Sequence, residues 1–195
     1  MDAITADLRR AVRWVAALNL GYFGIEFAVA LAIGSVSLFA DSIDFLEDTS
    51  INVLILIGLS WGAARRALLG KVLAGIILVP GLATLWTAWE KFNLPVAPEP
   101  LPLSLTGAGA LAVNFTCALM LMRYREHSGS LTRAAFLSAR NDTFANAAII
   151  GAGLLTALTL SAWPDLIVGL GIAVLNAGAA RDVFKAAQAE GRTAP

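Results

Sequence analysis

Four acidic residues lie close together in a stretch of the chain that is otherwise apolar. The segment from Ser35 to Trp61 is long and apolar enough to cross a membrane, and its middle contains Asp41, Asp44, Glu47 and Asp48. A carboxylate at the centre of a bilayer costs about 2.5 to 3.5 kcal/mol on insertion scales, so these side chains must face a partner helix, water or a bound cation. Carboxylate oxygens are ligands for divalent cations, and the cluster therefore indicates cation transport.

Helical spacing places most of these acids on one face. Residues three and four apart lie on the same side of a helix. At about 100° per residue, a single stripe roughly 80° wide contains Ser37, Asp41, Asp44, Asp48 and Asn52. Glu47 lies nearly a quarter turn from the centre of this stripe, so we expect it to have a different role.

Two other segments carry similar polar stripes. Residues 134–160 repeat the spacing with Ser138, Asp142 and Asn146, and residues 14–33 place Asn19 and Glu26 about two turns apart. The asparagines, including Asn114, are predicted to form hydrogen bonds between helices. Arg140 lies about 160° from Asp142 around its helix, so it is not expected to neutralise that acid.

These stripes require membrane helices to position them. Of 195 residues, 58% are hydrophobic and 14% are charged, as is typical of an integral membrane protein. About 20 apolar residues cross a bilayer core of about 30 Å, and six candidate spans lie near 14–33, 35–61, 71–89, 105–122, 134–160 and 163–183. The spans lack two-residue alternation, which favours helices over barrel strands. The predicted fold is all-α, with an N-terminal segment 1–13, a six-helix transmembrane domain 14–183 and a tail 184–195.

Basic residues predict the orientation, because short cytoplasmic loops retain positive charge. Most of the fourteen Lys and Arg precede the first span, join spans two to three and four to five, or follow the sixth. The opposite side has a neutral junction near Gly34, a Pro-rich loop with Lys91 as its one basic residue, and the turn 161–165. Both termini are therefore predicted to be cytoplasmic, in a bacterial-type inner membrane.

Depth places two of the acids at the same level. Asp44 and Asp142 are each about nine residues, roughly 13 Å, from opposite surfaces of the bilayer core, so antiparallel helices could bring them together. Asp44, Asp48 and Asp142, with Ser138 or water, would then form an oxygen-only site for a divalent cation. Asp41, Glu26 and Glu47 are expected to orient these ligands or to pass protons. The alternative is a structural polar network between helices.

Other features narrow the functional classes. The net charge is zero, so nothing points to a nucleic-acid partner, and the single cysteine, Cys117, is expected to be a buried thiol without a disulfide. His127 has no neighbouring histidines in its loop, and we do not expect it to bind metal.

Two sequence motifs resemble the cation diffusion facilitator family. They are the segment 19–26, which reads NLGYFGIE, and the segment 34–44, which reads GSVSLFADSID and continues to Asp48. In that family the second span carries His or Asp, three residues, then Asp, which matches Asp44 and Asp48. The fifth span carries the same pair; Asp142 matches its second member, and Ser138 stands where His or Asp is usual.

The resemblance covers all six spans and implies a transporter, not an enzyme. Its members export divalent metals such as zinc, manganese, iron, cobalt or cadmium, usually in exchange for protons and usually as homodimers. It implies a transported metal and no cofactor. The chain is expected to be a short member that lacks the C-terminal cytoplasmic domain of the family.

Three functional classes remain open. They are a proton-coupled metal exporter, a cation or proton channel, and a non-transporting metal-binding or regulatory relative. The oxygen-only ligand set favours harder ions such as manganese or iron and does not exclude zinc.

Overall fold

A computed structural model describes residues 3–58, 68, 82–124 and 130–175 of the chain. Within these residues the regular structure is helical, with α1 at Ala3–Ile33, α2 at Val36–Gly58, α4 at Pro100–Met122 and α5 at Ser130–Thr159. Two further helices occupy residues 82–93 and Trp163–Leu175. The predicted all-α fold is confirmed. Most of the third predicted span, the loop around His127 and the tail 184–195 lie outside the described residues.

Three of the described helices are long and apolar enough to cross a membrane, at Ala6–Ile33, Pro100–Met122 and Ala135–Thr159. The 23 residues of α4 extend about 35 Å, which exceeds a bilayer core of about 30 Å. Helix α2 has the same length but carries four carboxylates, and Trp163–Leu175 is a shorter apolar helix. This pattern agrees with a polytopic membrane protein.

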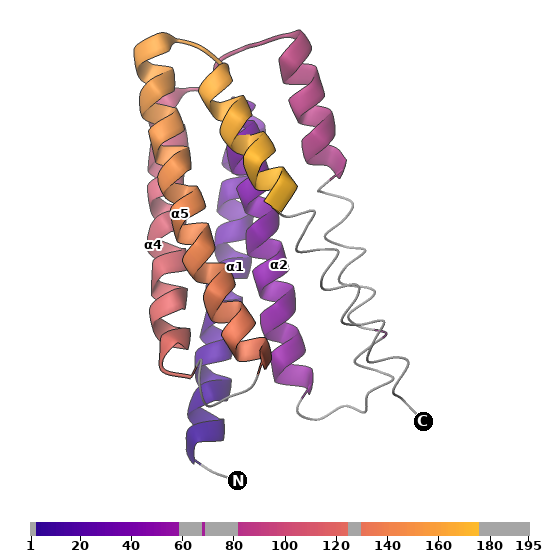
Figure 1. Ribbon diagram of the computed structural model, residues 1–195, viewed down its shortest axis with the longest axis vertical. Coiled ribbons are helices and arrows are strands. Elements are labelled where there is room, and N and C mark those ends of the chain that lie inside the picture. Colours follow the sequence, from indigo (N-terminus) through magenta and orange to yellow (C-terminus); the bar gives the residue numbers. More distant parts are fainter. Residues whose placement is uncertain (1–2, 59–67, 69–81, 125–129, 176–195) are drawn as a thin grey trace.

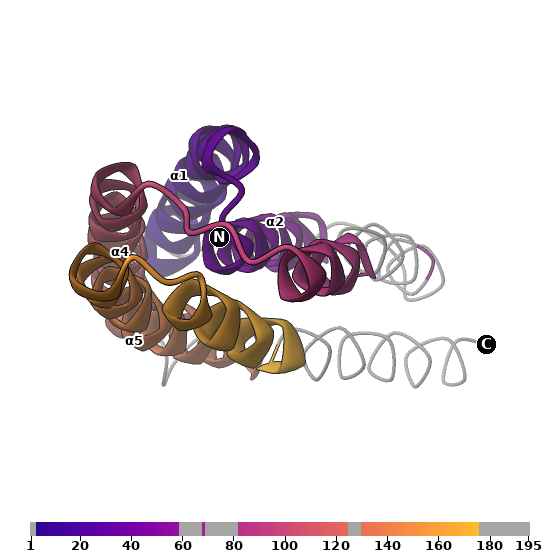
Figure 2. The same ribbon diagram turned by 90° about the horizontal axis from the view of Figure 1, so that it is seen from above.

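Four helices form a bundle in the order α1, α2, α5, α4 around its axis (Figures 1 and 2). Each of them contacts its two neighbours in this order. Helices 82–93 and Trp163–Leu175 lie beside α2, on the side away from α4 (Figure 2). Figure 1 places the N-terminus at the bottom, and we therefore call that end of the bundle the lower end and the opposite end the upper end.

Three helices begin earlier than their predicted spans, and one of them is α5, which begins at Ser130 rather than near 134. Helix α1 begins at Ala3, inside the predicted N-terminal segment 1–13, because Leu8 and Val12 are apolar residues one turn apart that pack into the bundle. Helix α4 begins at Pro100 rather than near 105. Proline suits the first turn of a helix, where its missing N–H is not needed.

A glycine makes the turn between α1 and α2. Gly34 has a φ of +64°, in the left-handed region that few other residues adopt, and the Ser35 N–H donates to the carbonyl of Ala30 at 3.0 Å. The turn reverses the chain over Gly34 and Ser35, so α2 runs antiparallel to α1.

Two apolar clusters fill the bundle at different heights. The lower cluster includes Leu8, Val12, Val15, Ile55, Cys117, Leu121, Phe136 and Ala139. The upper cluster includes Ala30, Leu38, Phe39, Ile43, Leu103, Ile149 and Ile172. A level that we call the polar layer lies mainly between these clusters and overlaps the edge of each, and it contains buried Asn19, Glu26, Asp41, Asp44, Glu47, Asp48, Asn52, Asn114 and Asn146, with Ser138 and Asp142 partly buried. Cys117 is a buried free thiol, as predicted.

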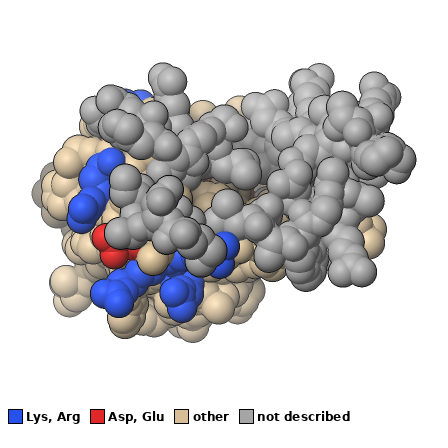
Figure 3. Space-filling model, turned by 90° about the horizontal axis from the view of Figure 1, so that it is seen from below, with Lys and Arg blue, Asp and Glu red and all other residues tan. Residues whose placement is uncertain are grey.

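The described basic residues are concentrated toward the lower end. Arg9, Arg10 and Arg13 lie in the first turns of α1, and Arg123 follows α4. Figure 3 shows several Lys and Arg side chains on the described part of the lower face. Lys91 is the described exception, near the upper end.

Candidate metal site

Helix α2 supplies four carboxylates to the bundle interior. The buried acids are Asp41, Asp44, Glu47 and Asp48. The hydroxyls of Ser42, Thr49 and Ser50 donate to carbonyls of α2 itself, at 2.7, 2.7 and 2.8 Å. A hydroxyl has one proton to donate, so these three do not donate to the neighbouring carboxylates.

Helix α5 brings Ser138 and Asp142 to the same level. The Ser138 hydroxyl lies within hydrogen-bonding reach of Asp48 and of Asp142. The carboxyl of Asp44 lies within electrostatic range of Asp142. Because Ser138 has a single hydroxyl proton, it can donate to only one of its two acids at a time. The structure therefore brings the four predicted ligands into one neighbourhood.

Two asparagines follow the acids at the same spacing. Asn52 Nδ2 donates to the main-chain carbonyl of Asp48 at 2.7 Å, and Asn146 Nδ2 donates to that of Asp142. The prediction of bonds between helices is wrong for these two amide groups, because a carbonyl of the same helix one turn earlier is within their reach. Each amide nitrogen is thus occupied, which leaves the amide oxygen.

Several buried oxygens of the polar layer lack a donor. Among the described residues, the oxygens without a hydrogen-bond partner include Asp48 Oδ1, Asp142 Oδ2, Asn52 Oδ1 and Asn146 Oδ1. An unpaired buried acceptor costs about 1 to 3 kcal/mol, and a charged one costs more. Asn19 Nδ2 is an unpaired donor at this level, so acceptors outnumber donors. This excess of acceptors favours the binding of a cation.

The carboxylates of the polar layer are too far apart, in their present rotamers, to bind one metal ion together. In the part of the chain that the structure describes, no three His, Cys, Asp or Glu side chains are close enough to hold a metal ion. Joint ligation by Asp44, Asp48 and Asp142 therefore requires their side chains to change rotamer. Such changes leave the helix backbone in place.

No described lysine or arginine forms a salt bridge with these acids. Arg140 is exposed and donates to Asn141 Oδ1 at 3.3 Å rather than to Asp142, as its position around α5 predicts. The ion pair found among the described residues joins Lys91 to Asp165, near the upper end. Buried acids without basic partners are costly inside a membrane, which argues against a purely structural network.

A second pair of acids lies beside the predicted ligands. Glu26 of α1 and Asp41 of α2 are both 0% exposed, and their carboxyl groups are close neighbours. No described residue donates to either carboxyl. Two carboxyl groups form a hydrogen bond only when one of them carries a proton, so the pair is suited to hold one. Glu47 is also buried, with Asp48 as its charged neighbour.

Sequence reasoning missed a polar cluster at the upper end. Asp165 is fully buried and accepts hydrogen bonds from Ser35, Ser37 and Lys91. Ser37 therefore interacts with Asp165 rather than with the acids of α2, and Lys91 lies in helix 82–93 rather than in a loop. A serine just before a helix is a common N-cap signal, but no local pattern pairs Ser35 with a residue 130 positions away.

The comparisons with known proteins agree with the all-α membrane fold. Residues 12–189 match the model of the family described as the cation efflux transmembrane domain, and this range includes every residue of the polar layer. No match was found among the curated proteins. The resemblance to the cation diffusion facilitators is thereby confirmed. The chain belongs to this cation efflux family, whose members are transporters, and it is a multi-pass membrane transporter of metal cations.

Proposed function

We propose that the chain exports a divalent metal cation in exchange for protons. The cation binds in the polar layer between α2 and α5, with Asp44, Asp48 and Asp142 as ligands and with Ser138 or water completing the shell. Asp41 and Glu47 orient the ligands, and Glu26 holds a proton with Asp41. The transport unit is the six-helix domain 14–183.

One observation carries this proposal. Acids of two helices lie between an upper and a lower apolar cluster, and several of their buried oxygens have no donor among the described residues. A metal ion would supply the positive charge and the ligand bonds that these oxygens lack. Protons would take its place when the metal leaves, because carboxylates that lie this close together titrate as a group.

The apolar clusters define the two sides of the cycle. The basic residues at the lower end support a cytoplasmic position for that end, and the proposed orientation has both termini cytoplasmic and the upper end facing outward. Metal enters from the cytoplasmic side when the helices separate at the lower cluster, and it leaves to the outside when they separate at the upper cluster. Helix rocking of this kind gives alternating access to a site of fixed position.

The ligand set limits the metals that fit. Three carboxylates and a hydroxyl are hard oxygen donors, which favour manganese or iron as the transported metal. Zinc, cobalt and cadmium are the other candidate substrates, and transport of each should be measured beside these two. A bacterial-type inner membrane is the proposed location. The proposed assembly is a homodimer, which a mass measurement of the purified protein in detergent would test.

Flux in proteoliposomes tests the function directly. Uptake of zinc, manganese, iron, cobalt and cadmium would be measured with and without a proton gradient, for wild type, Asp44→Asn and Asp142→Asn. We expect saturable uptake of at least one metal, proton movement in the opposite direction, and loss of both in the two variants. Asp7→Asn is the matched control, because Asp7 is an exposed acid of α1 outside the polar layer.

Each alternative class has its own outcome in this assay. Unsaturable conduction without proton exchange would indicate a channel. Tight metal binding with no flux in folded wild type would indicate a regulatory relative. Full flux in both variants would show that the site lies elsewhere.

A further inference from the structure

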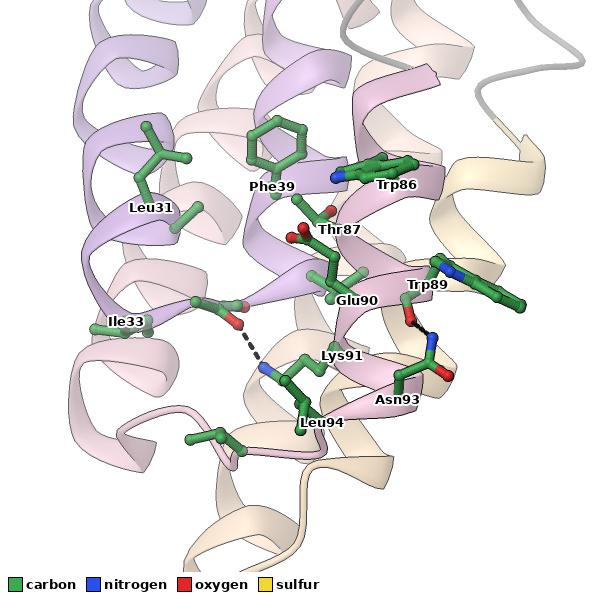
Figure 4. A pocket seen from close by; sticks show the side chains of 15 residues that line it. Leu31, Ile33, Phe39, Trp86, Thr87, Trp89, Glu90, Lys91, Asn93 and Leu94 are labelled. Atoms are coloured by element: carbon green, nitrogen blue, oxygen red, sulfur yellow. Dashed lines mark hydrogen bonds between the residues drawn. The ribbon is translucent and has the colours of Figure 1, made fainter.

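A cavity separates the turn between α1 and α2 from helix 82–93 at the upper end. Its volume is about 660 Å³, and its apolar lining includes Ile33, Phe39 and Trp86 (Figure 4). Because side chains do not fill this space, apolar packing joins the two segments incompletely. Lys91 crosses the gap, and its Nζ donates to the carbonyl of Gly34.

Three parts of the chain meet at one carboxylate. Asp165 Oδ2 accepts from Lys91 Nζ and from the N–H of Val36, both at 2.9 Å. Its Oδ1 accepts from the hydroxyls of Ser35 and Ser37, both at 2.6 Å. Lys91 is 7% exposed and Asp165 is 0% exposed, so the pair is shielded from solvent. We call Lys91, Asp165, Ser35 and Ser37 the upper clamp.

The clamp holds α2 by its first turn. The first N–H groups of a helix have no partner within the helix, and a negative charge is favourable there. Asp165 fills this role from a different helix. Close packing reinforces the contact, since a Cβ added to Gly169 would lie 2.7 Å from the main-chain nitrogen of Ser37. Any movement of α2 away from helix Trp163–Leu175 must therefore break the clamp.

The clamp lies between the polar layer and the upper face. Ser37 is one helical turn above Asp41 and about 10 Å along α2 from Asp44. Among the described residues the lower end has no comparable ion pair, and the lower cluster is apolar. The two ends are therefore closed by different interactions.

We propose that the upper clamp is the lock that keeps the upper end of the transport path closed. The inference rests on the proposed transport function. When the upper end opens, α2 separates from helices 82–93 and Trp163–Leu175, and the ion pair between Lys91 and Asp165 breaks. A buried charge without its partner is strongly unfavourable, so the intact pair favours the state that is closed above.

Thiol labelling from each side of the membrane tests the lock without depending on flux. In a Cys117→Ala background, which has no other cysteine, Ile43→Cys reports on the upper cluster and Val12→Cys reports on the lower cluster. A membrane-impermeant maleimide is added to oriented proteoliposomes from either side. Lys91→Met should raise the labelling rate of Ile43→Cys from the upper side at least about tenfold, within the 5- to 150-fold range typical of conformational coupling.

The second reporter separates a lock from general loosening. If Lys91→Met shifts a two-state equilibrium, labelling of Val12→Cys from the lower side must fall as labelling at Ile43→Cys rises. The double variant Lys91→Met with Asp165→Asn leaves no unpaired buried charge, and it should show the same shift if the single variant does not fold. Lys91→Arg keeps the charge and should label like wild type, and so should Arg123→Met, which removes an exposed charge at the lower end.

The outcomes distinguish this inference from the proposed function. Unchanged labelling at both reporters, or faster labelling at both, would overturn the lock. Absence of metal flux in wild type would instead refute the proposed function, whatever the labelling shows.

Discussion

Replacing Asp48 by asparagine should stabilise the metal-free protein, although Asp48 is buried and lies beside Ser138. Asp48 lies among several other acids and has no basic partner among the described residues. The substitution Asp48→Asn would remove one negative charge and add an NH₂ donor to a layer that has excess acceptors. Asp165→Asn is the matched comparison, because it neutralises a buried acid that does have a lysine partner.

The magnitude follows from helical geometry. Asp44 and Asp48 are four residues apart, which places their Cβ atoms about 6 Å from each other. At an effective dielectric constant of about 20, two full charges at that distance repel by about 3 kcal/mol, an upper limit because bound protons reduce it. A gain of about 1 to 2 kcal/mol would raise the apparent Tm by roughly 2 to 8 °C. Asp165→Asn leaves Lys91 unpaired and should cost about 3 to 5 kcal/mol.

Thermal unfolding of the purified protein in detergent, with and without manganese or zinc, measures both effects. Wild type should gain stability from the metal, and Asp48→Asn should lose most of that gain while starting from a higher Tm. Asp165→Asn should start lower and still respond to metal. A large loss of stability in metal-free Asp48→Asn, similar to that of Asp165→Asn, would refute the reasoning and favour a structural polar network.

Three further predictions test separate features. Ser138→Asp adds a carboxylate within reach of two ligands, and metal affinity measured by calorimetry should rise about 10-fold or more; unchanged affinity would place Ser138 outside the coordination shell. Glu26→Gln should leave metal affinity within a few-fold of wild type but reduce the stimulation of flux by a proton gradient, and undiminished stimulation would exclude Glu26 as the proton site. Gly169→Ala should destabilise the protein by about 1 to 3 kcal/mol, because its Cβ would clash with the α2 backbone, whereas Gly171→Ala, with nothing within 4 Å, should not; equal Tm changes would contradict the close packing.

The acidic face of α2 was predictable because it depends on local spacing. Asp41, Asp44 and Asp48 share a face through helix geometry alone. Because acidic side chains are costly inside a membrane, an acidic face in a membrane segment indicates a functional site. The same reasoning brought Asp142 to this level, since antiparallel helices of known rise fix the depth of each residue. The all-α fold followed from apolar segment lengths.

The upper clamp was not predictable in this way. Lys91 and Asp165 are 74 positions apart, and neither has a periodic pattern that marks it as buried. Their pairing depends on how two short helices pack beside α2. The amide bonds of Asn52 and Asn146 were missed for a different reason, because a polar side chain in a helix can bond either to another helix or to its own backbone, and spacing does not distinguish the two.

The two apolar clusters also bear on how the protein avoids leaking ions. They lie in series along the bundle, one on each side of the polar layer. A continuous file of water through the molecule would require both to be hydrated at the same moment. If each were hydrated independently about 1% of the time, both would be hydrated together about 0.01% of the time, and any coupling that closes one while the other opens would make this rarer still. Two modest barriers in series can thus preserve a proton gradient that neither barrier could preserve alone.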